Sequence, residues 1–203
     1  MVRIALFLTG LLLVVPVGVL AQEPGLGPGD PMPGSDLPLQ DRGGRSVTLS
    51  ALRGERATVV LFWSNTCPWT RAYRDRLERL ARAEEGHGVV FVFVNANDAE
   101  AFPHEATEAA RRAAPPERPN VHYVRDGRSA LARAFGARRT PEVFVFDATG
   151  RLVYTGAIDD NPRSEDEVEQ PYLAEVLTAL RQGTAPPVTR TDPYGCLIKF
   201  VKP

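Results

Sequence analysis

Two unbroken apolar runs constrain the fold of this chain more than any other feature. They are ATVVLFW at 57–63 and VVFVFVN at 89–95. Short runs of this kind, rich in β-branched and aromatic residues, are typical of strands that are buried on both faces of a sheet. Between them, residues 67–85 place four large apolar side chains at helical spacing: Trp69, Tyr73, Leu77 and Leu80. A strand, a helix and a strand in this order predict two parallel strands joined by a crossover helix.

The chain before and after this unit continues the alternation of short strands and helices. Residues 37–39 and 45–48 flank the turn 41–44 and predict a β-hairpin. Downstream, the pattern predicts a helix at 104–114, a strand at 121–124, a helix at 129–135, a strand–turn–strand unit at 142–156 and a helix at 173–183. The tail is irregular until LIKF at 197–200, which could add an edge strand. We therefore expect an α/β fold with a central mixed β-sheet, flanking helices and an N-terminal β-hairpin.

Residues 1–21 have the pattern of a secretory signal peptide. Arg3 precedes the apolar segment 4–15, and Val19-Leu20-Ala21 forms a small-residue cleavage site. A membrane anchor is the alternative, but the apolar stretch is broken at 16 and 18 and is short for the ~20 residues of a span. We expect cleavage after Ala21, an exported protein that is periplasmic or secreted, and no stable membrane anchor.

The remaining chain divides into a short leader and one domain. Residues 22–36 are nearly all Pro, Gly and small polar types, which predicts a flexible leader. Residues 37–203 then form one domain with a C-terminal tail. Of the 24 basic residues only one lies in the signal segment, so the mature chain carries 23 basic and 25 acidic residues, a charge of −2. This balance does not favour a nucleic-acid partner.

The two cysteines, Cys67 and Cys196, are too few to build a disulfide scaffold, so their chemistry is of more interest. Cys67 lies in LFWSNTCPWT, where a buried strand gives way to a helix. The free N–H groups and the positive end of the helix dipole favour a thiolate there. Pro68 suits the first helical position. The alternative is a buried, inert cysteine.

The other polar residues near these cysteines leave several interpretations open. Cys196 could resolve a sulfenic acid on Cys67, form a static disulfide or be a second inert thiol. Arg71, Arg138 and Arg139 could stabilise a thiolate or orient a peroxide, although a solvent-facing position is the simpler interpretation of each. We expect no metal and no cofactor, because no histidine has ligand spacing with Cys67: His87, His104 and His122.

Three separated motifs occur in the order of a known family: DLPLQDRGGRSVTLSALRG at 36–54, LFWSNTCPWT at 61–70 and GARRTPEVFVFDATGRLVYTGAIDD at 136–160. Two further stretches, VNANDAEAF at 94–102 and GCLIKF at 195–200, are similar to an exported subgroup of that family. This order resembles the thioredoxin-like superfamily, and within it the peroxiredoxin-like redoxins of the AhpC/TSA group and their exported subgroup. The resemblance implies a thioredoxin-like fold over residues 37–200.

The resemblance also implies a function and a set of site residues. It implies an exported thiol oxidoreductase with antioxidant or thiol-redox activity, with Cys67 as nucleophile and Cys196 as resolving thiol. Its partners would be a peroxide or a protein disulfide or thiol, and an external thiol reductant. Thr140-Pro141 would form a cis-proline loop that pairs with an extended substrate, and Ser64 would donate a hydrogen bond to the peroxide or the thiolate.

Two positions depart from the family patterns. Thr70 stands where thioredoxins carry the second cysteine of Cys-x-x-Cys, so we assign Thr70 to the substrate-binding set with Ser64, Thr140 and Pro141. Val60 stands where typical peroxiredoxins carry a proline. The alternative function is a non-catalytic binding module that recognises a partner through the Thr140-Pro141 loop.

The signal pattern generates a direct prediction about the mature protein. We expect its first residue to be Gln22 and the protein to be found outside the cytoplasm. N-terminal sequencing of the protein recovered from the extracytoplasmic fraction measures this. Recovery of a chain that still begins with Met1 would contradict the prediction.

Overall fold

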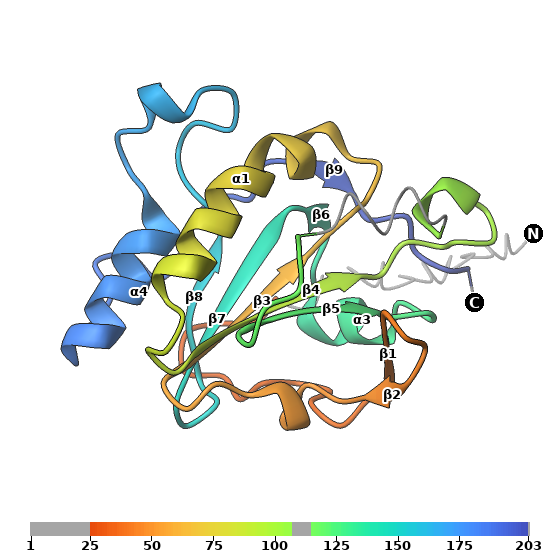
Figure 1. Cartoon of the computed structure of the whole chain (residues 1–203), viewed down its shortest axis with the longest axis horizontal. Coiled ribbons are helices and arrows are strands. Elements are labelled where there is room, and N and C mark those ends of the chain that lie inside the picture. Colours follow the sequence, from red (N-terminus) through yellow and green to blue (C-terminus); the bar gives the residue numbers. More distant parts are fainter. Residues whose placement is uncertain (1–24, 107–114, 203) are drawn as a thin grey trace, which may run out of the picture.

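A seven-stranded mixed sheet forms the centre of the computed structural model, which describes residues 25–106 and 115–202 (Figure 1). The strand order is β2-β1-β5-β4-β3-β7-β8. The strands are β1 Leu39–Asp41, β2 Ser46–Val47, β3 Ala57–Phe62, β4 Val89–Asn95, β5 Val121–Arg125, β7 Glu142–Asp147 and β8 Leu152–Gly156. The pairs β3–β4 and β4–β5 are parallel, and the remaining pairs are antiparallel. The predicted mixed sheet and N-terminal hairpin are therefore confirmed.

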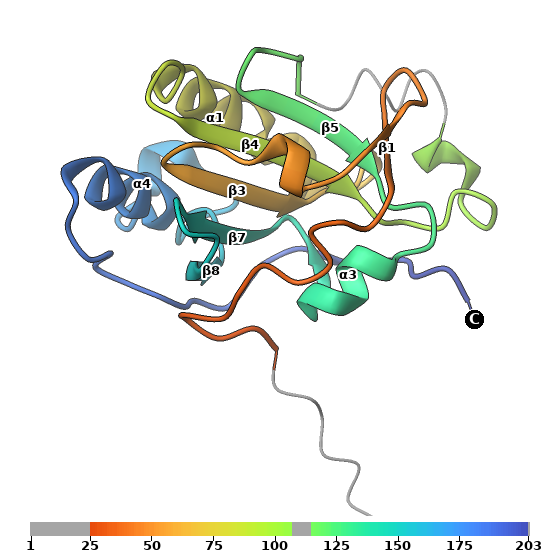
Figure 2. The same ribbon diagram turned by 90° about the horizontal axis from the view of Figure 1, so that it is seen from below.

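Helices cover both faces of this sheet. Helices α1 (Pro68–Ala83) and α4 (Tyr172–Gln182) lie on one face, and the short α3 (Ala130–Phe135) lies on the other (Figure 2). The described residues also contain 3₁₀ turns at Ser50–Leu52, Pro103–Glu105 and Glu165–Glu167. In the described part of the chain, no helix combines the length and apolar character needed to cross a bilayer.

Strand β3 is buried along its whole length and divides the core into two parts. Val59 and Leu61 pack beneath α1 and α4, whereas Val60 and Phe62 pack on the face covered by α3. Successive side chains of a strand point to opposite faces, so an apolar run is needed to fill both. The prediction from ATVVLFW is therefore correct.

Four segments differ from the expectations or lie outside the described residues. Residues 1–21 and 107–114 are not among the described residues; the described start of the expected helix 104–114 is only a 3₁₀ turn. Within the expected leader, Gly29 N–H donates to Leu152 O (2.7 Å), so this part packs along β8. The expected edge strand at 197–200 is instead β9, Cys196–Leu197, which pairs with β6, Arg139–Thr140.

The aromatic cluster around α3 generates a prediction about stability. The ring of Phe135 makes edge-to-face contacts with Phe62, Phe144 and Phe146 at centroid distances of 5.5, 5.1 and 5.6 Å. Phe135→Ala removes these contacts and leaves a cavity, so we expect a loss of ~3–5 kcal/mol in the free energy of unfolding, measured by denaturant titration.

The matched control is Phe102→Ala, because Phe102 is 43% exposed and touches the core little. The Lys199 ammonium lies over its ring, 4.7 Å from the centroid. We expect a loss of ~1 kcal/mol or less. Equal losses in the two variants would contradict the assignment of Phe135 to the core.

Candidate functional site

Cys67 lies at the junction between β3 and α1. It is the N-cap residue of α1, with an extended backbone, and Pro68 is the first helical residue. The residue is 2% exposed. Its N–H donates to Ser64 Oγ (3.1 Å), and its Sγ donates to Thr140 O (3.2 Å). The first N–H groups of a helix have no partner within the helix, so this position favours a negatively charged sulfur.

The cis-proline loop reaches Cys67 because of the register between β3 and β7. Phe62, the last residue of β3, lies opposite Glu142, the first residue of β7. The predicted cis bond between Thr140 and Pro141 is present, directly before Glu142. The Glu142 carboxylate accepts the backbone N–H groups of Arg138 (2.8 Å) and Arg139 (2.9 Å). Burial raises the pKa of Glu142, although these two donors favour its charged form.

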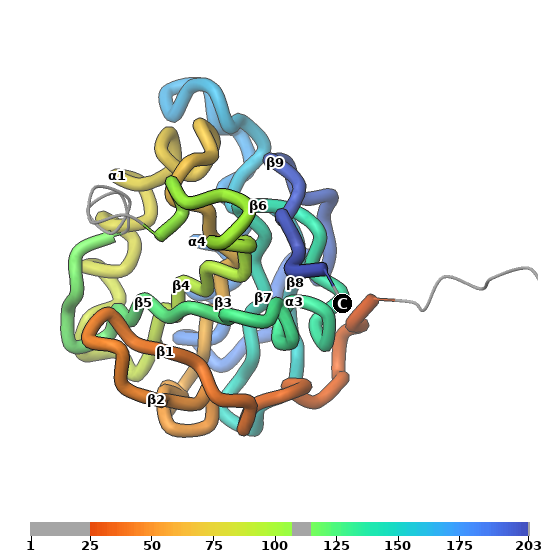
Figure 3. The backbone as a smooth tube through the Cα atoms, turned by 90° about the vertical axis from the view of Figure 1, so that its right-hand side faces the viewer, coloured from red at the N-terminus to blue at the C-terminus, as the bar shows by residue number. Residues whose placement is uncertain are grey.

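Cys196 is brought to the same place by the pairing of β9 with β6. In that pairing Thr140 lies opposite Cys196 and Arg139 opposite Leu197, and the two segments run side by side (Figure 3). Both cysteines are free thiols. Burial raises the pKa of Cys196 to about 11, and the interaction with the Cys67 sulfur contributes to the rise. The site therefore holds two neighbouring cysteines, and the raised pKa keeps Cys196 protonated at neutral pH.

A buried carboxylate, Glu105, organises the loop that precedes Cys67. Its side chain accepts hydrogen bonds from Ser64 Oγ (2.6 Å), Thr66 Oγ1 (2.5 Å), the Asn65 N–H (2.9 Å) and Asn95 Nδ2 (3.1 Å). Burial opposes the charge, but these hydrogen bonds outweigh it and lower the pKa of Glu105 below the ordinary value. Glu105 is therefore a charged acceptor at neutral pH that holds residues 64–66 in one conformation.

Lys199 links the C-terminal tail to this carboxylate. Its Nζ lies 3.4 Å from Glu105 Oε1 and donates to Thr66 Oγ1 (3.1 Å). The backbone of Lys199 is held as well, because its N–H donates to Asn97 Oδ1 (3.0 Å) and its carbonyl accepts the N–H of Asp98 (2.7 Å). The tail is thus anchored three residues beyond Cys196.

Ser64 and Thr70 do not direct their hydroxyl protons at a substrate in this structure. Ser64 Oγ donates its only proton to Glu105 and accepts the N–H of Cys67. Thr70 Oγ1 lies 2.5 Å from Ser64 O and 2.8 Å from Cys67 O, so its proton is directed to the backbone. Both residues support the conformation around Cys67, whereas Thr140, Pro141 and Cys196 lie beside it.

Several of the arginines and histidines named from the sequence hold the tail or face solvent. The Arg139 guanidinium donates to Gly195 O (2.8 Å), so it holds the tail; Arg71 is exposed on α1. His87 and His104 are exposed. Among the described residues there is no group of three or more His, Cys, Asp or Glu side chains arranged to hold a metal ion.

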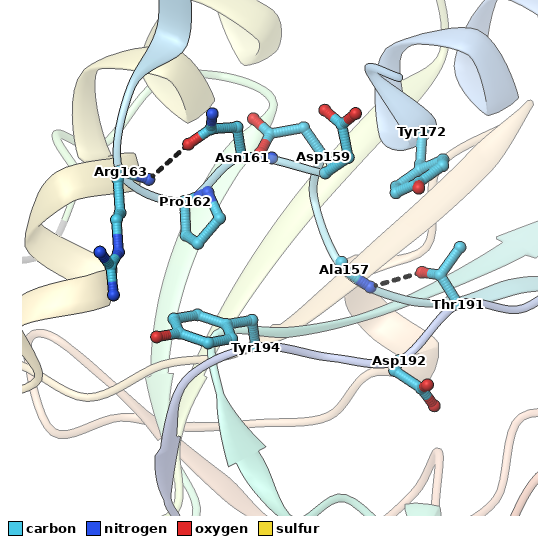
Figure 4. A pocket seen from close by; sticks show the side chains of 10 residues that line it. Ala157, Asp159, Asn161, Pro162, Arg163, Tyr172, Thr191, Asp192 and Tyr194 are labelled. Atoms are coloured by element: carbon cyan, nitrogen blue, oxygen red, sulfur yellow. Dashed lines mark hydrogen bonds between the residues drawn. The ribbon is translucent and has the colours of Figure 1, made fainter. Parts of the chain in front are cut away.

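The side chain of Tyr194 also lines a groove of about 600 Å³ beside the tail (Figure 4). Tyr194 packs edge to face on Trp69, with ring centroids 4.7 Å apart. In the same groove, Asp159 accepts hydrogen bonds from Tyr73 OH (2.6 Å) and Arg76 Nη1 (2.8 Å). The Trp69–Tyr194 contact therefore fixes the tail to α1 immediately before Cys196.

Glu105, Lys199 and Asn95 are site residues that the sequence analysis did not identify. Glu105 stands in a polar stretch with a helical pattern, so nothing local marks it as buried. The available signals were weak: an asparagine that ends the apolar run 89–95, and a single lysine within the apolar motif GCLIKF. Each signal is informative only when it is known that the segments around Asn95, Glu105 and Lys199 meet in the folded chain.

Comparison with known proteins places this chain in a family. The Redoxin family model matches residues 27–172. The thiol:disulfide interchange protein DsbE of Yersinia pestis is 26% identical over 135 residues, which cover 66% of this chain and 66% of that protein. A hypothetical protein of Sinorhizobium meliloti 1021 is 31% identical, with a TM-score of 0.72 over 88% of this chain and 97% of its own.

Further solved structures are also similar to this chain. An uncharacterized conserved protein of Geobacillus kaustophilus is 31% identical, with a TM-score of 0.75 over 86% of this chain and 93% of its own. More distant structures, among them a putative thiol:disulfide interchange protein and a peroxidoxin, are 20% identical or less and show the shared thioredoxin-like fold alone. With its sheet order and its two neighbouring cysteines, this chain is a thioredoxin-like redox protein that belongs to the redoxin family.

Proposed function

We propose that this redoxin is an exported, peroxiredoxin-like thiol oxidoreductase in which Cys67 reduces a hydroperoxide and Cys196 resolves the oxidised sulfur. One observation carries the proposal: Cys196 lies opposite Thr140 in the β6–β9 pairing, while the Cys67 Sγ contacts the carbonyl oxygen of Thr140 at 3.2 Å. Two thiols held this close, one of them at a helix N-terminus, suit oxidation followed by disulfide formation.

The reaction has three steps. The Cys67 thiolate attacks one peroxide oxygen, the O–O bond breaks, and the alkoxide leaves with the electron pair and takes a proton from solvent. The resulting sulfenic acid is attacked by the sulfur of Cys196, so an S–S bond forms and the hydroxyl leaves as water with the Cys196 proton. An external dithiol then reduces this disulfide by thiol–disulfide exchange and is itself oxidised to a disulfide.

The local environments support this division of roles. Burial and the neighbouring Cys67 sulfur keep the pKa of Cys196 at about 11, so Cys196 is a thiol at neutral pH. Cys67 has the helix N-terminus, which stabilises a thiolate. Since the thiolate is the nucleophile, Cys67 meets the oxidant first and Cys196 acts second.

The alternative is a non-catalytic module that binds a partner through the Thr140-Pro141 loop. That loop is already paired, because β9 occupies the backbone opposite Arg139 and Thr140. The paired thiols favour redox chemistry over simple binding. Thiol–disulfide exchange without peroxide, which the name of the Yersinia pestis relative describes for that protein, would use the same two sulfurs.

Peroxide treatment followed by intact-mass analysis tests the proposal. One equivalent of hydrogen peroxide should convert the reduced chain to a species lighter by two hydrogens, because Cys67 and Cys196 form a disulfide. The Cys196→Ser variant should instead accumulate a sulfenic acid that a dimedone probe captures on the Cys67 peptide. The Cys67→Ser variant should remain unreacted. A wild-type chain that stays reduced while Cys67 can still be alkylated would refute the peroxide reaction.

The raised pKa of Cys196 predicts how alkylation of the two thiols depends on pH. In the reduced chain, iodoacetamide should label Cys67 before Cys196 at neutral pH, and the Cys196 rate should rise only as the pH approaches its pKa of about 11. Peptide mapping after limited labelling measures both rates. Preferential labelling of Cys196 at neutral pH is the contrary result.

The Cys67→Ser variant supplies the control for the cause of that raised pKa. It removes the neighbouring sulfur, while the burial of Cys196 remains. The pKa of Cys196 should therefore fall, more thiolate is present at a given mildly alkaline pH, and its alkylation should become several-fold faster. An unchanged rate would mean that Cys67 does not influence Cys196.

A further inference from the structure

Strand β9 covers a backbone edge that lies beside the Cys67 sulfur. Along this edge Arg138 O accepts the N–H of Ile198 (2.9 Å), and Arg139 and Thr140 pair with Leu197 and Cys196. An unpaired edge of this kind accepts an extended polypeptide as an added strand. In this protein the chain's own C-terminus supplies that strand.

Cys196 has the position that the cysteine of a bound polypeptide would have. It lies opposite Thr140, whose carbonyl oxygen accepts the Cys67 Sγ hydrogen bond. The residue opposite Thr140 is therefore the residue of any added strand that lies nearest to the nucleophile. A polypeptide disulfide and the C-terminal strand compete for the same place.

The approach of the strand is unusually close at Gly195. A Cβ atom added there would lie 2.1 Å from Thr140 O and 2.6 Å from the carbonyl carbon of Thr140. The Arg139 guanidinium also holds the carbonyl oxygen of Gly195 (2.8 Å). Because no side chain fits between the strand and the loop, the strand stays in place only with glycine at this position.

On the C-terminal side of Cys196, an ion pair and a buried side chain hold the strand in place. The Lys199 ammonium pairs with the buried carboxylate of Glu105 (3.4 Å), and Ile198 is 6% exposed. On the other side of Cys196, Tyr194 packs on Trp69. Removing the strand from the edge therefore breaks contacts on both sides of Cys196 at once, including a charge pair with a buried member.

We infer that the C-terminal segment 194–200 makes the Cys67 site selective for small oxidants over polypeptide disulfides. The inference rests on the proposed function and adds that polypeptide disulfides are the class of oxidant that the tail excludes. Cys67 is 2% exposed, so a hydroperoxide reaches its sulfur after a local shift of side chains. A polypeptide needs the edge 138–140 as well, and it obtains that edge only when β9 has left.

Two disulfides with the same leaving group test this selectivity. One is dithiobis-nitrobenzoate; the other is a short uncharged peptide whose central cysteine is joined to thionitrobenzoate. In both reactions the Cys67 thiolate attacks a disulfide sulfur, an S–S bond to Cys67 forms, and thionitrobenzoate leaves with the electron pair of the broken bond. The quantity measured is the rate of the reaction with the peptide disulfide divided by the rate of the reaction with dithiobis-nitrobenzoate. This quotient is the rate ratio used below.

The first comparison uses two chains that both lack the Cys196 thiol. One is the full-length Cys196→Ser variant, and the other ends at Pro193, so the two differ only by the strand-forming tail. We expect the rate ratio to be higher in the truncated chain by about tenfold or more, which corresponds to about 1.4 kcal/mol of competition from the tail. An unchanged ratio in a truncated chain with a folded circular dichroism spectrum overturns the inference.

The second comparison remains decisive if the truncated chain does not fold. In the Cys196→Ser background, Gly195→Ala forces the strand away from Thr140, whereas Gly127→Ala adds a Cβ atom with no neighbour within 4 Å. We expect the rate ratio to rise several-fold with Gly195→Ala only. Equal ratios in these two variants overturn the inference. Neither comparison uses peroxide, so a failure of the peroxide reaction is recognised separately by the absence of sulfenic acid on Cys67.

Discussion

The site depends on the hydrogen bonds and the ion pair that the buried carboxylate of Glu105 makes. It accepts hydrogen bonds from Ser64, Asn65 and Thr66, the three residues directly before Cys67, and it pairs with Lys199 of the tail. A buried charge with this many donors has few alternative arrangements, because loss of one partner leaves it unsatisfied. The turn that presents Cys67 and the tail that presents Cys196 are thus positioned by one group.

This arrangement explains how a redoxin without a Cys-x-x-Cys motif can still bring two sulfurs together. Thr70 replaces the second cysteine of that motif, and its hydroxyl is directed to the backbone carbonyls of Ser64 and Cys67. The second thiol comes instead from Cys196, 129 positions further along the chain, by pairing of β9 with the cis-proline loop. In the proposed reaction the same strand supplies the resolving sulfur, and it also covers the edge that a polypeptide substrate would use.

Local pattern predicted most of the fold but few of the residues that support the conformation around Cys67. The apolar runs that became β3 and β4 filled both faces of the sheet, as their composition indicated. Glu105 was hidden within a stretch of helical pattern, because a buried acceptor and a surface acid are identical in sequence. Ser64 was expected to donate a hydrogen bond to the peroxide or to the thiolate, whereas in the structure its proton is directed to Glu105.

The sequence by itself determined the alternation of strands and helices, because hydrophobic periodicity and turn residues act over short distances along the chain. It also determined the place of Cys67 at a helix N-terminus, since a strand, a Cys-Pro pair and a helix follow one another directly. Only the tertiary structure decided that Cys196 lies beside Cys67 and that Lys199 reaches Glu105. Those contacts join segments about a hundred residues apart, and their strength comes from burial and shared partners that no local pattern encodes.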